Sequence, residues 1–326
     1  MSKLHLVTGA AGHLGQAVIT KLKQQGERVR ALVLPHEKNK LKDIEIIEGN
    51  ILDKSSLLPF FNFKNKDVSL IHCAGVVSIS KHDKDIMNQV NIRGTKNLLD
   101  LSLKNEIGNF IYVSSVHAIT EAPTIYEPKL LDPSLVVGDY AKTKAAASNL
   151  VIGARGMGLN TNIVFPSGMI GPYDLGNGHL TQMVVDFYKG KLPIAIRGGY
   201  DFVDVRDVAK AIVTISNSNI KNESFILSNR YYTIKEMLNL LYDITKQKKT
   251  KIYLPISLVR LVTPIIELYS RVKDKNPLFT SYSLYTLQSN SIFSHSKAYD
   301  ILGYRTRSME ETLRDTINYL KKFNIV

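Results

Sequence analysis

Short apolar runs alternate with longer amphipathic stretches through the first half of the chain. Residues 3–8 form an apolar run that ends in glycine, and residues 13–25 place Leu14, Val18 and Leu22 on one face at helical spacing. The same alternation predicts strands at 28–34, 44–48, 68–73, 109–114 and 161–165, with helices that include 84–105 and 139–156. Strands that alternate with helices predict a parallel sheet covered by helices on both faces.

The second half of the chain has a looser pattern. It predicts helices at 178–189, 204–216, 233–246, 255–272 and 308–322, and a strand at 223–227. We therefore expect an α/β fold in two parts. Residues 1–171 would form the doubly wound core, and residues 172–326 a smaller substrate lobe that is interleaved with the last core elements.

Composition supports a folded core and narrows the partners. The 326 residues are 44% hydrophobic and 22% charged, with a formal net charge of +13. The lysines are scattered, their densest cluster is Lys246, Lys248, Lys249 and Lys251, and basic residues do not alternate with aromatic ones. We therefore expect no nucleic-acid partner, and general surface charge rather than a functional basic patch. An anionic cofactor or substrate would also benefit from this charge.

Cys73 is the single cysteine, so an intrachain disulfide is impossible and a multi-cysteine metal site is absent. The chain enters a strand at once instead of an apolar signal core, and it has no uninterrupted apolar run of about 18 residues. We expect a cytoplasmic protein without a bound metal and without a membrane span.

The first strand runs into the sequence TGAAGHLG, whose glycines are Gly9, Gly12 and Gly15. Glycine lets the backbone come close to a ligand, and the following helix offers free N–H groups and a positive dipole end to a pyrophosphate. The spacing is G-x-x-G-x-x-G rather than G-x-G-x-x-G. Its position between a strand and an amphipathic helix nevertheless predicts a Rossmann-type dinucleotide site, to which we also assign Leu14.

Three Tyr-x-x-x-Lys pairs occur: Tyr140/Lys144, Tyr242/Lys246 and Tyr269/Lys273. Four-residue spacing puts both side chains of each pair on one helix face, so context must choose among them. Tyr140 begins a helix rich in small residues and follows by 25 residues Ser115, at the end of the fifth strand. Ligands of open α/β sheets bind at such strand ends, which favours Tyr140 and Lys144.

The chemistry explains this combination. A free tyrosine, with a pKa near ~10, is a poor base at neutral pH, and a nearby ammonium would lower that pKa. Tyr140 could then exchange a proton with an alcohol or carbonyl while a hydride moves to or from nicotinamide. A serine hydroxyl could hold the same oxygen. We choose Ser115 for this role, with Ser114 as the alternative, because the two alternate in direction along a strand.

With these residues the chain resembles the extended short-chain dehydrogenases/reductases over essentially its full length. The motifs that carry the resemblance are TGAAGHLG, GNILD at 49–53, HCAG at 72–75, VNIRGTKNLL at 90–99, YVSSVHA at 112–118, YAKTK at 140–144, FPSGMIGP at 165–172 and FVDVRDVAKA at 202–211. The resemblance implies that Asn50 and Ile51 touch the adenine side of the cofactor. It also implies that Ala74 and Gly75 lie near its ribose.

By the same resemblance, Lys144 holds the nicotinamide ribose, and Pro166 and Ser167 lie beside the nicotinamide ring. Asn91 resembles the helix asparagine of the family, and we expect a structural role for it. Cys73, inside the HCAG strand, is expected to be a small buried filler rather than a nucleophile.

The sequences YAKTKAAAS and PSGMIGP make the chain most similar to dihydroflavonol-4-reductase-like and 3β-hydroxysteroid-dehydrogenase-like members. Sugar-nucleotide members commonly carry arginine where this chain has Phe165. We therefore expect an NAD(P)-dependent oxidoreductase that acts on a small or hydrophobic alcohol or carbonyl compound. A sugar-nucleotide epimerase or dehydratase and a non-catalytic dinucleotide sensor are the alternatives.

NADP is slightly preferred over NAD, because Leu34 stands where NAD sites usually carry an acid and Glu37 arrives late. Lys38 and Lys40 could meet a 2′-phosphate, although the arginine typical of NADP members is missing. The resemblance also implies a homodimer through the helices at 84–105 and 139–156, with the small residues at 145–148 permitting close approach. The alternative is that these helices only cover the sheet.

Residues 252–272 are strongly apolar but interrupted by charges and by Pro264, which makes a bilayer span improbable. We expect a kinked helix that covers the substrate cleft, with a membrane-surface helix as the alternative. Both imply an apolar pocket and hence an apolar alcohol or ketone as substrate.

Overall fold

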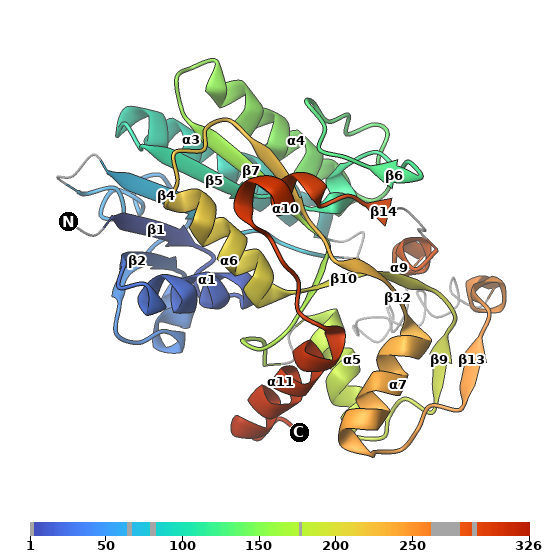
Figure 1. Cartoon of the computed structure of the whole chain (residues 1–326). Coiled ribbons are helices and arrows are strands. Elements are labelled where there is room, and N and C mark those ends of the chain that lie inside the picture. Colours follow the sequence, from blue (N-terminus) through green and yellow to red (C-terminus); the bar gives the residue numbers. More distant parts are fainter. Residues whose placement is uncertain (1–2, 64–66, 79–82, 176–177, 262–280, 289–291) are drawn as a thin grey trace.

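A seven-stranded parallel sheet forms the centre of the computed structural model, which describes residues 3–63, 67–78, 83–175, 178–261, 281–288 and 292–326 (Figure 1). The strand order is β11-β7-β5-β4-β1-β2-β3. The strands are β1 (Leu4–Thr8), β2 (Arg28–Val33), β3 (Glu45–Glu48), β4 (Val68–His72), β5 (Asn109–Val113), β7 (Thr161–Pro166) and β11 (Ser224–Leu227). This is the doubly wound Rossmann sheet that the alternating pattern predicts.

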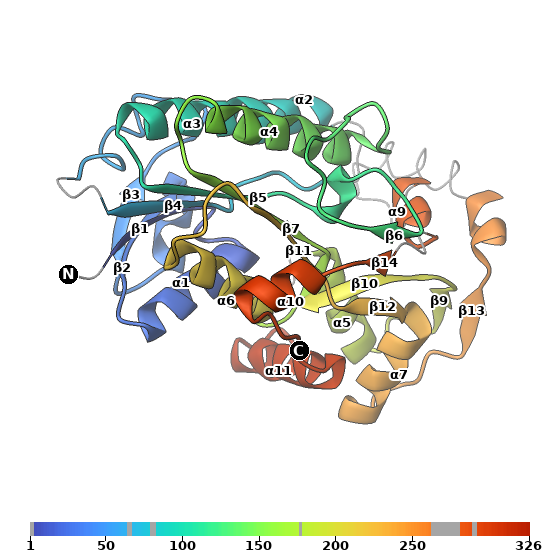
Figure 2. The same cartoon turned by 45° about the horizontal axis from the view of Figure 1, so that its top comes forward.

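Helices cover both faces of the sheet (Figure 2). On one face lie α1 (His13–Gln24) and α6 (Val205–Ser216), and on the other lie α3 (Thr95–Lys104) and α4 (Asp139–Arg155). Side chains of β5 alternate between the two layers. Phe110 and Tyr112 pack in the hydrophobic cluster that includes α3 and α4, whereas Ile111 and Val113 pack in the cluster that includes α1 and α6.

The stretch predicted as one helix over 84–105 contains a change of helical pitch. It begins as α2 (Lys84–Met87), continues as the π-helical turn η3 (Asn88–Gly94) and ends as α3. A Cβ on Gly94 would lie 2.5 Å from the Ile51 side chain, so the wider turn and the missing side chain let the loop after β3 approach. A helical segment is therefore present where predicted, but its backbone hydrogen bonds change from the α-helical to the π-helical pattern in the middle.

The lobe is built from small sheets and the remaining helices. Its strands are β6 (Thr124–Ile125), β8 (Gly168–Ile170), β9 (Ile194–Ile196), β10 (Gly199–Asp204), β12 (Arg230–Thr233), β13 (Ile252–Leu254) and β14 (Ile292–Phe293). Its helices are α5 (His179–Tyr188), α7 (Ile234–Thr245), α9 (Ser281–Thr286), α10 (Ser296–Leu302) and α11 (Met309–Lys322). The chain after residue 172 also supplies β11 and α6 to the core, so the two parts interleave. The boundary at 171/172 stays a prediction.

Polar side chains start the long helices and tie the C-terminus to the core. Asp204 caps α6 by accepting a hydrogen bond from the Arg206 backbone N–H at 2.7 Å, and caps of this kind contribute about 1 kcal/mol. The same carboxylate accepts the Thr312 hydroxyl at 2.8 Å, while the Arg206 guanidinium bridges to Asp315. One buried acid thus begins a core helix and holds α11 against it.

The apolar stretch 252–272 is only partly within the described residues. Its first residues form β13, and residues 256–261 are helical. The kink expected at Pro264, and the rest of the predicted helix, lie outside the described residues. Among the helices that the structure describes, none is long and apolar enough to cross a bilayer.

Candidate active site

The glycine loop lies where the strand order reverses, at the carboxyl ends of β1 and β4. Gly9 has φ +63°, and a Cβ there would lie 2.5 Å from the Ala74 backbone nitrogen. A Cβ on Gly15 would lie 2.1 Å from the Gly9 carbonyl oxygen. Only glycine permits this close approach of three backbone segments. The loop therefore lies at the switch point of the sheet, the crevice at which open α/β folds bind dinucleotides.

The first turn of α1 faces this crevice. Gly12 precedes the helix and carries no side chain to cap it, and the first turn holds no acidic residue. The N–H groups and the positive end of the helix dipole therefore remain available to an anion. Leu14 is buried in the core with the rest of the helix face, and its place in the cofactor site stays a prediction.

Asn50 and Ile51 follow β3 at the same edge of the sheet. The Asn50 carboxamide oxygen accepts a hydrogen bond from the Leu52 N–H at 3.0 Å, which shapes the turn. Ile51 is buried, and its carbonyl accepts a hydrogen bond from Asn97 of α3 at 2.9 Å. Both residues thus follow the carboxyl end of β3, and their contact with the adenine side of the cofactor stays a prediction.

Asn91 fixes the loop after β4. Its side-chain oxygen accepts the Val76 N–H at 2.8 Å, and its nitrogen donates to the Val76 carbonyl at 3.0 Å and to the Thr143 hydroxyl at 3.0 Å. A Cβ on Gly75 would lie 3.2 Å from the Asn91 oxygen. The π-turn, the loop of Ala74 and Gly75, and α4 are thereby joined at one side chain, which agrees with a structural role for Asn91.

Lys144 is buried beneath the same loop. Its ammonium donates to the Val113 carbonyl at 2.5 Å and lies 4.4 Å from the centre of the Tyr112 ring. Burial lowers the pKa of Lys144 to about 7. A Cβ on Gly75 would lie 3.8 Å from the Lys144 nitrogen, so this cation reaches the loop that the resemblance assigns to the cofactor ribose.

Ser115 and Tyr140 meet, whereas Ser114 turns away. The Ser115 hydroxyl hydrogen-bonds to Tyr140 and lowers its pKa, but burial has the larger effect and raises the pKa of Tyr140 to about 12. The expected lowering of this pKa by Lys144 is therefore wrong for the structure, because desolvation of the phenolate dominates. Ser114 lies 2.7 Å from the Ser148 hydroxyl of α4 inside the protein. The alternation of strand β5 thus separates the two serines.

The competing tyrosine–lysine pairs do not share this setting. Lys246 ends α7 in a left-handed conformation with φ +55°, and its ammonium lies 5.5 Å from the Tyr242 ring on the outside of the lobe. Tyr269 and Lys273 lie outside the described residues. Within the part of the chain that the structure describes, Tyr140 and Lys144 are the pair beside the glycine loop.

Pro166 ends β7, and Ser167 follows it next to the lobe. The Ser167 hydroxyl donates to the Asp201 carboxylate at 2.5 Å, and the Asn229 N–H donates to the same oxygen at 2.9 Å. Burial raises the pKa of Asp201. The segment assigned to the nicotinamide side is therefore held by a buried acid of β10.

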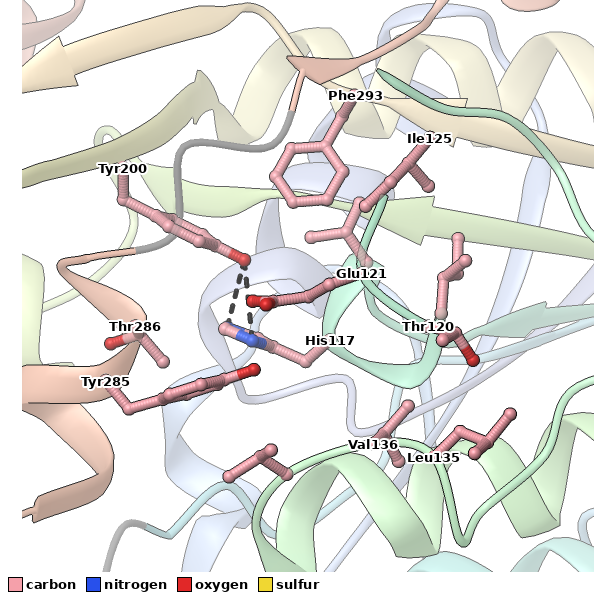
Figure 3. Close-up of a pocket in the computed structure, with 13 residues that line it drawn as sticks. His117, Thr120, Glu121, Ile125, Leu135, Val136, Tyr200, Tyr285, Thr286 and Phe293 are labelled. Atoms are coloured by element: carbon pink, nitrogen blue, oxygen red, sulfur yellow. Dashed lines mark hydrogen bonds between the residues drawn. The ribbon is translucent and has the colours of Figure 1, made fainter. Parts of the chain in front are cut away.

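A pocket of ≈ 220 Å³ opens beside His117 and Tyr200 (Figure 3). Tyr200 and Tyr285 form one side, Leu135 and Val136 lie opposite them, and Phe293 closes the end. The lining residues are Val116, His117, Ile119, Thr120, Glu121, Ile125, Leu135, Val136, Val137, Tyr200, Tyr285, Thr286 and Phe293. Aliphatic and aromatic side chains stand beside polar groups, namely the His117 ring and the hydroxyls of Thr120, Tyr200, Tyr285 and Thr286, and Glu121 is the one carboxylate or ammonium group among these lining residues.

His117 connects the pocket with Tyr140, and the sequence analysis did not identify it. Its ring meets the Tyr140 ring edge-on at 6.2 Å between centres and stacks on Tyr200 at 5.2 Å. The Tyr200 hydroxyl lies 3.3 Å from His117 Nε2 (Figure 3). Burial lowers the pKa of His117 to about 4, so the ring is neutral at pH 7. Its place two residues after Ser115 was the one sequence signal available.

Cys73 does not take part in this chemistry. It lies against the core, and burial raises the pKa of its thiol to about 12, so the reactive thiolate is suppressed at neutral pH. No group of three or more His, Cys, Asp or Glu side chains among the described residues is arranged to hold a metal ion.

Comparison with known proteins agrees with this geometry. Sterol demethylase protein B from Methylococcus capsulatus is 25% identical over 328 residues, covering 98% of this chain and 99% of that protein. The crystal structure of gox2253 superimposes with a TM-score of 0.84 at 27% identity, covering 100% of both chains. A Thermotoga maritima UDP-glucose 4-epimerase has a TM-score of 0.77 at 23% identity, covering 98% and 99%, which shows a shared fold.

The family assignment rests on a longer match than any single motif. The model of the NAD dependent epimerase/dehydratase family matches residues 5–227, from the first strand through β11. This span contains the glycine loop, Ser115, Tyr140, Lys144 and Ser167. The chain therefore belongs to the NAD dependent epimerase/dehydratase family and is an enzyme of the extended short-chain dehydrogenase/reductase type.

Proposed function

We propose that this enzyme is an NAD(P)-dependent oxidoreductase whose substrate is an apolar alcohol or ketone, with Tyr140 as the acid/base. The observation that carries the proposal is the pocket beside His117. Its walls combine aliphatic and aromatic side chains with hydroxyl groups, and none of the described residues that line it is lysine or arginine. A sugar nucleotide carries a diphosphate, which proteins usually bind with such cations. An apolar substrate fits these walls better.

The residues around the crevice fit a dinucleotide. Side chains at Gly9 or Gly15 would collide with the backbone of this loop and of the Ala74 segment, so only glycine keeps the loop in this shape, and the open helix end supplies N–H donors for a pyrophosphate. A bound nicotinamide would accept or donate the hydride. The first turn of α1 would hold the pyrophosphate, and Lys144 would hold the ribose on the nicotinamide side.

Three side chains would handle the proton. Tyr140, protonated at neutral pH, would donate to the oxygen of a carbonyl substrate, and Ser115 would hold that oxygen by a hydrogen bond. In the opposite direction Tyr140 would first lose its phenolic proton, and the phenolate would then accept the alcohol proton. The name of the relative sterol demethylase protein B supports an apolar alcohol as the substrate class.

A slight preference for NADP is part of the proposal. Leu34 stands at the end of β2, and the Glu37 carboxylate turns back to accept the Leu34 N–H at 3.4 Å instead of facing the crevice. No acid is thus presented there for a ribose 2′-hydroxyl among the described side chains. The side chains of Lys38 and Lys40 lie outside the described residues. Tighter binding of NADH than of NADPH in parallel titrations would reject this preference.

A cofactor-coupled screen tests the proposed reaction. Hydrophobic ketones and secondary alcohols, including sterols, would be compared with UDP-sugars while NAD(P)H absorbance is followed. We expect net cofactor turnover with apolar compounds. More efficient conversion of a sugar nucleotide would favour the epimerase or dehydratase alternative. Dinucleotide binding without turnover of any class would favour the sensor.

A further inference from the structure

Three segments of the lobe, those at the C-terminal ends of α5, α7 and α11, lie at one end of the molecule (Figures 1 and 2). Lys251 donates its backbone N–H to the Pro193 carbonyl at 3.3 Å, which joins the segments that follow α5 and α7. Lys321 of α11 lies 5.4 Å from the ring of Tyr188, the last residue of α5. We call this surface the basic edge. It consists of Lys189, Lys191, Lys246, Lys248, Lys249, Lys251 and Lys321.

Exposed apolar side chains follow the basic edge along β13: Ile194 and Ile252 adjoin it, and the helical turn 256–261 lies at the other end of that strand (Figure 1). Ile194 of β9 and Ile252 of β13 are partners in the parallel pair, with 46% and 51% of their surfaces exposed. Leu258 and Leu261 on the following helical turn are 50% and 76% exposed, and their spacing of three puts them on one face. We call these four residues the apolar tip.

Helix ends explain only part of this charge. Cations near a helix C-terminus are favoured by its dipole, and Lys321 lies in the last turn of α11. Lys189 and Lys246 are the C-cap residues of α5 and α7 and are favoured in the same way, whereas Lys191, Lys248, Lys249 and Lys251 lie beyond the helix ends. Among the described residues, the Asp243 carboxylate lies 3.8 Å from the Lys246 ammonium, and Asp186 lies on α5, where it accepts a hydrogen bond from Gln182. The basic edge keeps a positive excess.

The apolar tip is connected with the pocket. Val259, on the same helical turn as the leucines, packs with Ile196 of β9 and Leu284 of α9 in a separate hydrophobic cluster. The next residues of α9, Tyr285 and Thr286, line the pocket. A surface docked through the apolar tip would therefore lie one layer of side chains from the proposed substrate site.

We propose that the basic edge and the apolar tip together dock this enzyme on an anionic phospholipid surface. Lysine ammonium groups are attracted to anionic head groups, and exposed aliphatic side chains gain free energy by entering the head-group boundary. Nucleic acid would satisfy the lysines but not the four aliphatic side chains, since phosphate contacts use polar donors. The docking is independent of the proposed catalysis and is measured by binding.

Vesicle co-sedimentation of the full chain tests the proposal. We expect binding to phosphatidylcholine vesicles that contain phosphatidylserine, much weaker binding to phosphatidylcholine alone, and a loss of binding as salt rises. Lys248→Glu/Lys251→Glu leaves the Tyr242 contacts of Lys246 and Lys249 in place and should weaken binding roughly tenfold or more. Leu258→Ser/Leu261→Ser should weaken it as well.

Matched controls carry the same changes on the core. Lys210→Glu/Lys221→Glu alters the charge equally on α6 and the following loop, and Leu58→Ser alters an exposed leucine before β4. Both should bind vesicles like the wild type. Equal binding to both vesicle types, or equal effects of edge and control variants, would overturn the proposal. So would binding to duplex DNA without binding to vesicles.

A second measurement needs no variant. Hydrogen exchange of the wild-type chain with phosphatidylserine vesicles should slow in residues 189–194 and 246–261. Protection confined to other segments would also overturn the assignment. Because neither experiment measures turnover, failure of the docking leaves the proposed reaction unaffected, and the substrate screen can fail while docking holds.

Discussion

Tyr140 differs from phenylalanine by the one oxygen that Ser115 contacts. Tyr140→Phe should therefore keep the fold and the crevice but remove the proton donor. We expect turnover of the best substrate to fall by ~10²-fold or more, while dinucleotide affinity persists. Steady-state kinetics and a cofactor titration measure the two effects. Turnover close to that of the wild type would show that another group moves the proton.

The two serines at the end of β5 form a matched pair. Ser115→Ala removes the hydrogen bond to Tyr140 and the one accepted from the His117 N–H, and we expect a loss of turnover on the order of 10²-fold together with about 1 kcal/mol of stability. Ser114→Ala removes the contact with Ser148 inside the protein and should cost about 1 kcal/mol of stability with little effect on turnover. The opposite outcome would make Ser114 the functional serine.

Sequence context was enough to bring Ser115, Tyr140 and Lys144 together, because strand ends and helix starts fix their places. It could not give the sign of the Tyr140 pKa shift, since that depends on burial as well as on the lysine. Nor could it find Tyr200, which comes from β10 and meets His117 across 83 residues of chain. Contacts between the core and the lobe join residues far apart in the chain, so they produce no periodic pattern in the sequence.

At the scale of elements, the join between β1 and α1 has no space for a side chain at Gly15. Gly15→Ala would place a methyl group 2.1 Å from the Gly9 carbonyl, so the loop must shift, and we expect dinucleotide binding to be lost. Gly153→Ala is the control. Nothing lies within 4 Å of its Cβ position in α4, and we expect roughly 0.5–1 kcal/mol of added stability there with unchanged binding.

Calorimetric cofactor titrations and thermal melts distinguish these two glycine variants. Wild-type cofactor affinity in Gly15→Ala would contradict the assignment of this loop. A lower melting temperature in Gly153→Ala would contradict the view that this glycine has no conformational or packing role.

Periodicity predicted the seven core strands and their helices well. The buried positions of a strand repeat at a different spacing from the buried positions of a helix, so the two kinds of element can be told apart in the sequence. The π-turn at Asn88–Gly94 was not predictable in this way. It keeps the apolar face of the 84–105 helix, and its cause is the approach of Ile51 to Gly94 from another loop. The sequence shows that α4 is rich in small residues, but it does not show that these residues face the interior of the chain.

At the scale of the whole molecule, the homodimer stays a prediction, and one argument for it is weakened. Ala145, Ala147 and Ser148 are buried within the chain itself, so they do not offer a small-residue face to a partner. The remaining argument is that related proteins often form dimers by pairing these two helices. Light scattering at micromolar concentration should give twice the mass of one chain, and a single-chain mass would leave the helices as covers of the sheet.

Buried histidines make the whole fold sensitive to acid. Burial lowers the pKa of His5 to about 4, of His72 to about 3 and of His117 to about 4. In the unfolded chain these groups bind protons near their ordinary value of 6.5. Between the two values the unfolded chain holds more protons, so stability is full above about pH 6.5 and falls as the pH drops toward 4. At pH 5 each histidine removes about 2 kcal/mol.

His5→Leu tests this account away from the candidate site. His5 lies in β1, and neither of its ring nitrogens has a hydrogen-bond partner among the described residues. The variant should therefore fold, and its urea midpoint, measured by circular dichroism, should fall less between pH 7 and pH 5 than that of the wild type. The difference corresponds to about 2 kcal/mol of unfolding free energy. His36→Gln, at an exposed position, should fall as the wild type does. If His5→Leu loses as much stability as the wild type, acid unfolding is controlled by groups other than the buried histidines.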